Sequence, residues 1–192
     1  MPLPRIIGQA WSAFRARYWA WFGVTALVLA FGVALRQSSS EADFYSRWGV
    51  DPANLPYQSD VDPRTAIELG KARVADNGKM LMVTFGANWC PDCLTLHKNL
   101  RDLATRAYAE RRFEMVHIDV GDSAKTARVQ HDLGIPVSGI PLAVFYSADG
   151  RPIGDTLAGE LQPSRHYSSR DILDFLRVVA DYRRVVSPDQ RQ

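Results

Sequence analysis

Cysteine is scarce in this chain: only two of its 192 residues are cysteine, Cys90 and Cys93, and both lie in one short stretch. This excludes a structural disulfide elsewhere, so the fold must be stabilised by an ordinary hydrophobic core. A structural zinc site usually needs four cysteine or histidine ligands, and the chain has no second C-x-x-C and no closely spaced pair of histidines. Haem attachment needs a histidine directly after the second cysteine, where Leu94 stands. His97 could supply a third metal ligand, but we expect no metal and no organic cofactor.

Outside its N-terminus the chain also lacks an excess of charge of either sign. Its 23 basic and 21 acidic residues give a net charge of +2, but residues 1–40 hold four arginines and no acid. The remainder is slightly acidic, with 19 basic against 21 acidic residues. A near-neutral domain has no basic surface of the kind that nucleic-acid binding requires, so we expect no nucleic-acid partner.

Long uncharged runs are missing except at residues 18–35, which form one run of eighteen. As a helix this run spans roughly 27 Å, close to the ~30 Å hydrocarbon core of a membrane. Aromatic residues gather at its N-terminal end, three arginines precede it, and acidic residues follow soon after it. This pattern is typical of a membrane span whose N-terminal side stays in the cytoplasm. We therefore predict a cytoplasmic N-terminus at residues 1–17, one transmembrane anchor at 18–35, and export of everything that follows.

A cleavable signal peptide is the alternative for this segment, because residues 32–34 resemble a cleavage site. The run is longer than the usual apolar region of a signal peptide, about 7–15 residues, which favours an uncleaved anchor. Residues 36–61 are polar and punctuated by proline, and we interpret them as a linker between anchor and domain. The linker also contains aromatic residues, so part of it could pack on the domain or lie at the lipid surface: Phe44, Tyr45, Trp48 and Tyr57.

Residues 62–186 alternate between helical and strand patterns, and residues 187–192 follow as a tail. The periodicity and the proline, glycine and capping signals predict helices at 63–77, 90–110, 123–133 and from 168 onwards, with strands at 80–85, 113–120, 142–146 and 153–158. A serine at 168 and an acid three residues later form the expected capping box of the last helix. The alternation predicts an α/β domain.

The two cysteines lie where this pattern changes from strand to helix. Pro91 suits the first helical position, which makes Cys90 the N-cap residue and puts Cys93 one turn inside the helix. The positive end of the helix dipole favours a thiolate at Cys90, so we predict that Cys90 is the nucleophile. Cys93 shares a predicted helix face with Leu96, Leu100 and Leu103, so we expect it to be more buried and to act as the resolving thiol.

The stretch Trp89-Cys90-Pro91-Asp92-Cys93 after a strand, followed about fifty residues later by Gly139-Ile140-Pro141, resembles the thioredoxin superfamily. The resemblance covers roughly residues 62–184 and is closest to bacterial membrane-tethered thioredoxin-like proteins and to the C-terminal domain of DsbD-type transporters. It implies a thioredoxin fold, with a central mixed sheet flanked by helices. It also implies that Pro141 is a cis-proline, faces the dithiol and pairs with substrate backbone.

Two positions depart from that family. Thioredoxins carry a buried acid in the strand before the motif, and the matching residue here is Thr84. The lysine that accompanies this acid is also missing, with Met115 nearest to its place. Removal of the proton from Cys93 must therefore depend on water, on Cys90 or on another group, for which His117 is one candidate.

The predicted reaction is thiol–disulfide exchange on protein disulfides, through a redox-active Cys90–Cys93 pair. The resemblance implies that the backbone of Gly139, Ile140 and Pro141 holds the substrate chain, while Trp89, Pro91 and Asp92 shape the rim.

The Asp92 carboxylate disfavours the Cys90 thiolate and so predicts a reductase, which would take electrons from a membrane donor. The predicted location is the bacterial inner membrane, with a single span and the catalytic domain in the periplasm. The alternative is a tethered binding or assembly factor that uses the same fold without net redox turnover.

Overall fold

The computed structural model describes residues 25–31 and 41–186, with side chains up to Asp181. The chain divides into two units, Met1–Arg47 and Trp48–Gln192. In the first unit, residues 25–31 and 41–47 are helical. Most of the anchor predicted at 18–35 lies outside the described residues, as do the predicted cytoplasmic segment 1–17 and the tail 187–192. Within 25–31 and 41–186, no helix is both long enough and apolar enough to cross a membrane.

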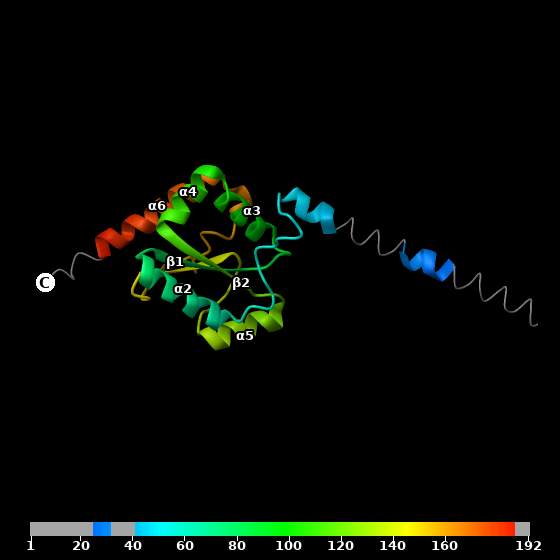
Figure 1. The fold of residues 1–192 in the computed structure, drawn as a ribbon, viewed down its shortest axis with the longest axis horizontal. Helices are drawn as coiled ribbons and strands as arrows, with labels where there is room; N and C mark the ends of the chain where they lie inside the picture. The colour runs from blue at the N-terminus through cyan, green and yellow to red at the C-terminus, as the bar shows by residue number, and fades with distance from the viewer. Residues whose placement is uncertain (1–24, 32–40, 187–192) are drawn as a thin grey trace, which may run out of the picture. The chain divides into compact units, whose positions relative to one another are not determined.

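The second unit is built on a four-stranded mixed sheet (Figure 1). Its strands are β1 (Met80–Gly86), β2 (Phe113–Asp119), β3 (Leu142–Tyr146) and β4 (Pro152–Asp155), in the spatial order β2-β1-β3-β4. Strand β1 runs parallel to β2 and antiparallel to β3, and β3 runs antiparallel to β4. Every residue of β1 is buried, because helices cover the sheet on both faces.

Two groups of helices make the outer layers (Figure 1). On one face lie α2 (Pro63–Asn77) and α5 (Ser123–Leu133), and on the other lie α3 (Pro91–Leu100), α4 (Leu103–Arg112) and α6 (Ser169–Val186). Alternate residues of β1 serve the two layers: Leu81 and Val83 pack in the cluster with α2 and α5, and Met80 and Met82 pack with α3, α4 and α6. The expected α/β fold with a mixed sheet between helices is confirmed.

One predicted helix is divided in two. The helix expected at 90–110 ends at Leu100, and α4 begins at Leu103 after Asp102, whose carboxylate accepts a hydrogen bond from the Ala104 N–H at 3.3 Å. An aspartate N-cap favours a new helix start at this point. Leu103 is 77% exposed, so its expected position on the face of Cys93 is wrong.

The ends of the domain also differ in part from the sequence expectation. Strand β4 is shorter than the predicted strand at 153–158. The predicted capping box of α6 is confirmed, because the Asp171 carboxylate accepts hydrogen bonds from the Ser168 N–H and hydroxyl. Residues 48–61, which we assigned to the linker, belong to the second unit. Val50 and Tyr57, which lie in this segment, are buried among the side chains of the second unit.

Candidate active site

Cys90 and Cys93 occupy the start of α3, directly after the buried strand β1. Cys90 is the N-cap residue and Pro91 is the first helical residue, as predicted. The Cys90 sulfur accepts a hydrogen bond from the Cys93 N–H at 3.3 Å, and the two sulfur atoms lie 2.6 Å apart as free thiols. Cys93 is fully buried, whereas Cys90 keeps 5% of its surface exposed. The more accessible sulfur is thus the one at the helix end.

The surroundings separate the acidities of the two thiols. The pKa of Cys90 is lowered, mainly by its hydrogen bond with the Cys93 side chain and also by backbone N–H groups of the first helical turn. The pKa of Cys93 is raised far above its usual range, by burial first and then by its hydrogen bond to Cys90 and the negative charge that Cys90 can carry. The predicted division into a nucleophile and a buried second thiol agrees with these directions.

Asp92 lies between the cysteines in sequence, but its carboxylate points to a distant segment. It accepts hydrogen bonds from the Arg165 N–H at 2.9 Å and from Arg165 Nε at 3.2 Å, and it pairs with Arg165 Nη2 at 3.1 Å. Arg165 lies in η1, the short helix Ser164–His166. The Asp92 charge does raise the pKa of Cys90, as expected, but the hydrogen bonds from Cys93 outweigh it and the net direction is downward. Asp92 thus acts on Cys90 in the expected direction, but it does not decide the net shift of the Cys90 pKa.

The Ile140–Pro141 peptide bond is cis, as predicted, and it lies beside the dithiol. The Cys90 sulfur is 4.0 Å from the Ile140 carbonyl oxygen, and Ile140 packs against the cluster that contains Tyr57, Cys90 and Cys93. Gly139, just before it, faces the side-chain amide of Gln162 so closely that a Cβ atom would collide with it. The loop before β3 is thereby held against the start of α3.

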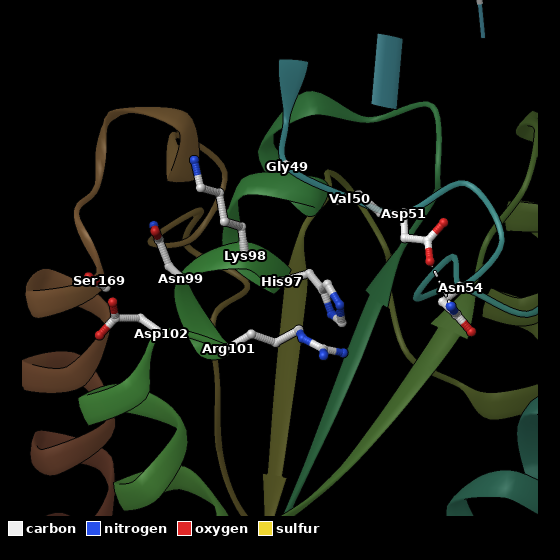
Figure 2. A pocket seen from close by; sticks show the side chains of 10 residues that line it. All are labelled: Gly49, Val50, Asp51, Asn54, His97, Lys98, Asn99, Arg101, Asp102 and Ser169. Carbon is white, nitrogen blue, oxygen red and sulfur yellow. Dashed lines mark hydrogen bonds between the residues drawn. The ribbon is translucent and has the colours of Figure 1, made fainter. Parts of the chain in front are cut away.

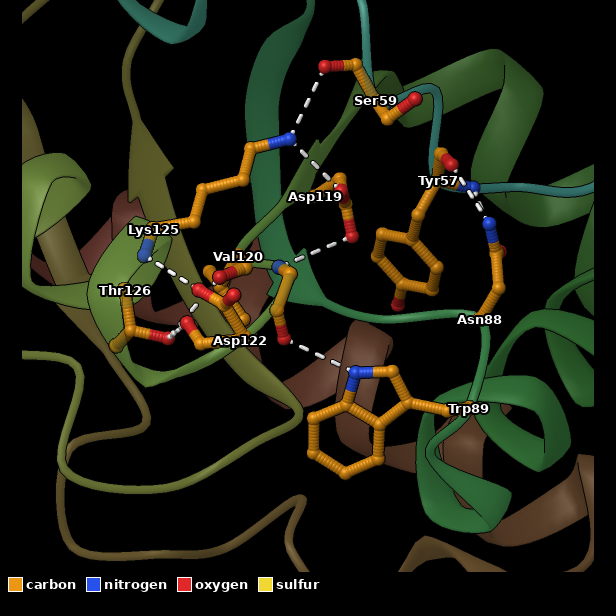
Figure 3. Close-up of polar contacts among 10 residues, drawn as sticks. Tyr57, Ser59, Asn88, Trp89, Asp119, Val120, Asp122, Lys125 and Thr126 are labelled. Carbon is orange, nitrogen blue, oxygen red and sulfur yellow. Dashed lines mark hydrogen bonds and ion pairs between the residues drawn. The ribbon is translucent and has the colours of Figure 1, made fainter.

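A groove of about 440 Å³ runs along this loop. It brings together three of the predicted substrate-binding residues, Trp89, Gly139 and Ile140, with residues 120–123 and with α5. Pro91, Asp92 and Pro141 are not among the residues that line it. Trp89 is 60% exposed, and its indole N–H donates to the Gly121 carbonyl at 3.0 Å, which fixes the ring at the groove edge (Figure 3).

Two residues of the site were not predicted. Arg165 was missed because its partner Asp92 is 73 positions away. Tyr57 was noticed only as an aromatic of the linker, yet it is 2% exposed and packs in one cluster with Cys90 and Cys93. The only local signal for Tyr57 is an aromatic residue in a polar stretch, which does not reveal its partner.

The Thr84 hydroxyl contacts one histidine, which in turn contacts a second. Strand pairing places Thr84 opposite His117, and the Thr84 hydroxyl lies 2.5 Å from His117 Nδ1. His117 in turn meets the ring of His97 edge-on, with ring centroids 5.6 Å apart. His97 also lines a separate cavity of about 640 Å³ beside α3 (Figure 2). In the part of the chain that the structure describes, no group of three or more His, Cys, Asp or Glu side chains could hold a metal ion.

Comparison with known proteins identifies relatives of this chain. The thioredoxin-like domain family matches residues 68–169. A disulphide isomerase from Xylella fastidiosa Temecula1 is 35% identical over 66% of this chain and 97% of its own, with a TM-score of 0.61. Two further structures are more distant. A DsbH oxidoreductase is 14% identical over 69% of this chain and 90% of its own, with a TM-score of 0.44. A thioredoxin from Thermus thermophilus is 22% identical over 67% of this chain and 86% of its own, with a TM-score of 0.40. No match was found among the curated proteins. On the strength of the matched domain and the Xylella relative, the chain belongs to the thioredoxin-like family.

Proposed function

We propose that this protein is a thiol–disulfide oxidoreductase acting on protein disulfides through Cys90 and Cys93. The observation that carries the proposal is the pairing of the more exposed thiol, of lowered pKa and at the N-cap of α3, with a fully buried thiol whose sulfur lies 2.6 Å away. A pure binding module needs neither the second thiol nor this separation of acidities.

The chemistry has two steps. The Cys90 thiolate attacks one sulfur of the substrate disulfide, forms a mixed disulfide and releases the other substrate sulfur as a thiolate. The Cys93 sulfur then attacks Cys90, which releases the second substrate thiol and leaves a Cys90–Cys93 disulfide. The substrate is reduced by two electrons and the protein is oxidised by two, so a dithiol donor must restore it.

The groove beside Cys90 supports a polypeptide as the substrate. The family resemblance implies that backbone groups at Gly139, Ile140 and Pro141 pair with an extended chain; Gly139 and Ile140 line the groove, and the exposed Trp89 ring offers an apolar contact. The Xylella relative is named a disulphide isomerase, and isomerisation begins with the same attack by one thiolate on a substrate disulfide.

The reducing direction, the membrane anchor and export remain part of the proposal. The Asp92 carboxylate opposes the thiolate form of Cys90, which favours a reductase over a strong oxidant. The apolar run 18–35 and the arginines before it support a single span with the domain outside the cytoplasm, where a membrane electron transporter could reduce the protein. Alkaline phosphatase fused after residue 186 should be active if the domain is exported and inactive if it is not.

Activity is tested with the full chain, a disulfide-bonded protein such as insulin, and dithiothreitol as the electron source. The wild type should accelerate reduction, and Cys90→Ser should abolish the acceleration. Cys93→Ser should accumulate a mixed disulfide with the substrate, visible by mass spectrometry. Unchanged client binding without any acceleration by the wild type would instead favour the tethered binding factor.

A further inference from the structure

The second step of this chemistry raises the question of where the Cys93 proton goes. Cys93 is fully buried and must lose its proton as its sulfur attacks Cys90. Thr84 stands where thioredoxins carry a buried acid, and a hydroxyl has no useful acidity of its own. A neighbouring group must therefore accept the proton or pass it on.

Three polar side chains form a continuous path that starts at Cys93. Tyr57 packs in one buried cluster with Cys90 and Cys93, and the Cys93 thiol and the Thr84 hydroxyl are the side-chain groups whose hydrogen bonding influences the pKa of its phenol. The Thr84 hydroxyl lies 2.5 Å from His117 Nδ1, well within hydrogen-bond reach, and 3.4 Å from the Val116 carbonyl. The Tyr57 and His117 rings also meet edge-on, with centroids 5.7 Å apart.

Tyr57 is held in this place by contacts at both its backbone and its ring (Figure 3). Asn88, two residues before Cys90, accepts from the Tyr57 N–H at 3.1 Å and donates to the Tyr57 carbonyl at 2.7 Å. Two residues after Tyr57, the Ser59 carbonyl accepts from Lys125 Nζ at 3.1 Å. The ring lies directly on Gly86 of β1, where a Cβ atom would come within 2.5 Å of the tyrosine oxygen. The segment that we had assigned to the linker thus delivers a fixed hydroxyl to the dithiol.

We propose that Tyr57, Thr84 and His117 form a proton relay that serves Cys93 in the resolving step, with Tyr57 as the group that touches the reacting thiol. This inference rests on the proposed function and names residues that the family resemblance does not supply. Thr84 and His117 act through Tyr57 and are positioning residues.

Each proton in the relay has a donor and an acceptor. The Cys93 proton moves to the Tyr57 oxygen, the Tyr57 proton moves to the Thr84 oxygen, and the Thr84 proton moves to His117 Nδ1. The Cys93 electron pair forms the bond to Cys90, and the substrate sulfur leaves with the electrons of the broken bond. When a donor later reduces the disulfide, the same path runs backwards and returns a proton to the leaving Cys93 sulfur.

His117 is suited to the end of this path. Burial, and the neighbouring His97, lower the pKa of His117 to about 4, so the ring is neutral near pH 7 and Nδ1 takes up a proton only transiently before passing it on. His97 meets this ring edge-on and also lines the 640 Å³ cavity, so we assign the exit of the proton to this side of the domain.

The test separates the two steps of exchange with dithiobis-nitrobenzoate, which releases a coloured thiol in each step. Rapid mixing with the reduced full chain gives the rate of attack by Cys90 from the first release and the rate of resolution by Cys93 from the second. Tyr57→Phe and Thr84→Val should slow the second release by about tenfold or more while leaving the first within about twofold. Thr84→Ser keeps the hydroxyl and should restore the second rate.

Tyr108→Phe is the matched control, because it removes a phenol hydroxyl from the far core cluster and should change neither rate. Equal slowing of both releases by Tyr57→Phe and Thr84→Val, or an unchanged second release in either, would overturn the relay. If Tyr57→Phe does not fold, the Thr84→Val and Thr84→Ser pair decides alone. Release of only one equivalent by the wild type would contradict the proposed function itself.

Discussion

The Asp92 carboxylate is held by Arg165 through three contacts, from the Arg165 N–H at 2.9 Å, Nε at 3.2 Å and Nη2 at 3.1 Å. The pair joins the active-site helix α3 to η1. The charge beside the dithiol is therefore held by a residue 73 positions away in the sequence. Because Arg165 partly neutralises Asp92, the repulsion between Asp92 and a Cys90 thiolate is weaker than the motif alone suggests.

Breaking this pair should therefore change the reactivity of Cys90 in a predictable direction. Arg165→Gln removes the guanidinium that balances the Asp92 charge, although the main-chain N–H bond to Asp92 stays, and should raise the Cys90 pKa, which slows attack at neutral pH by about threefold because less thiolate is present. Asp92→Asn removes the negative charge and should lower the Cys90 pKa. The pH dependence of Cys90 alkylation measures both, and a shift of the two variants in the same direction would refute this account.

Gly86→Ala should displace Tyr57 from the dithiol. The added methyl group would collide with the tyrosine ring, so we expect a loss of about 2–3 kcal/mol in the free energy of unfolding. The resolving step should slow as well. Urea unfolding measures the loss, and Gly154→Ala is the control because a Cβ at Gly154 meets nothing within 4 Å. Equal stability of the two variants would show that Tyr57 is not packed on Gly86.

Asn88→Ala removes both hydrogen bonds that hold the Tyr57 backbone. Loss of one partner from such a pair costs about 1–3 kcal/mol when the remaining groups are buried. Residues 48–61 should also become more sensitive to limited proteolysis. Asn54→Ala is the control, since the Asn54 amide only contacts the nearby Asp51 carboxylate on the surface. Unchanged proteolysis in Asn88→Ala would mean that other contacts hold the segment.

Stability should fall as the pH drops from about 6.5 to about 4. Burial lowers the pKa values of His97 and His117 to about 4, with Arg101 adding to the effect at His97, whereas the unfolded chain titrates near 6.5. The unfolded state then binds more protons, so stability that is complete above pH 6.5 is lost as the pH falls. His117 should account for up to about 3 kcal/mol, and His97, which lines a cavity, for less.

The measurement is the free energy of urea unfolding between about pH 7 and pH 4. His117→Gln should flatten the fall, whereas His131→Gln should not, because the His131 side chain is 89% exposed. Since all three proteins carry the same carboxylates, the difference between the curves isolates the histidine. A fall of equal size in His117→Gln and the wild type would contradict the assignment.

Local signals predicted much of this structure. The N-cap role of Cys90, the first-turn position of Pro91 and the cis bond at Pro141 follow from residues within a few positions of each other, or from the family resemblance. The strands were found because their apolar runs are short and bounded by turn residues. Asp102 also carried a local signal, an N-cap residue inside an apparent helix, and the division between α3 and α4 could have been inferred from it.

The contacts that were missed are long-range. Tyr57 meets Asn88 from 31 positions away, and Asp92 meets Arg165 from 73. No hydrophobic periodicity marks Tyr57 or Arg165. Tyr57 lies in an irregular segment, and Arg165 lies in the three-residue helix η1. The pairing of Thr84 with His117 depends on the register of β1 and β2, which hydrophobic pattern alone cannot set when both faces of the sheet are buried.

The central claim is that Cys90 and Cys93 form one redox couple, and equilibration of the full chain in dithiothreitol and glutathione buffers tests it most directly. The account predicts that both cysteines are reduced together in a single two-electron transition, with a potential near that of thioredoxin, about −270 mV. A potential near about −120 mV would contradict the reducing direction. Failure of the two thiols to form a disulfide in any buffer would contradict the oxidoreductase itself.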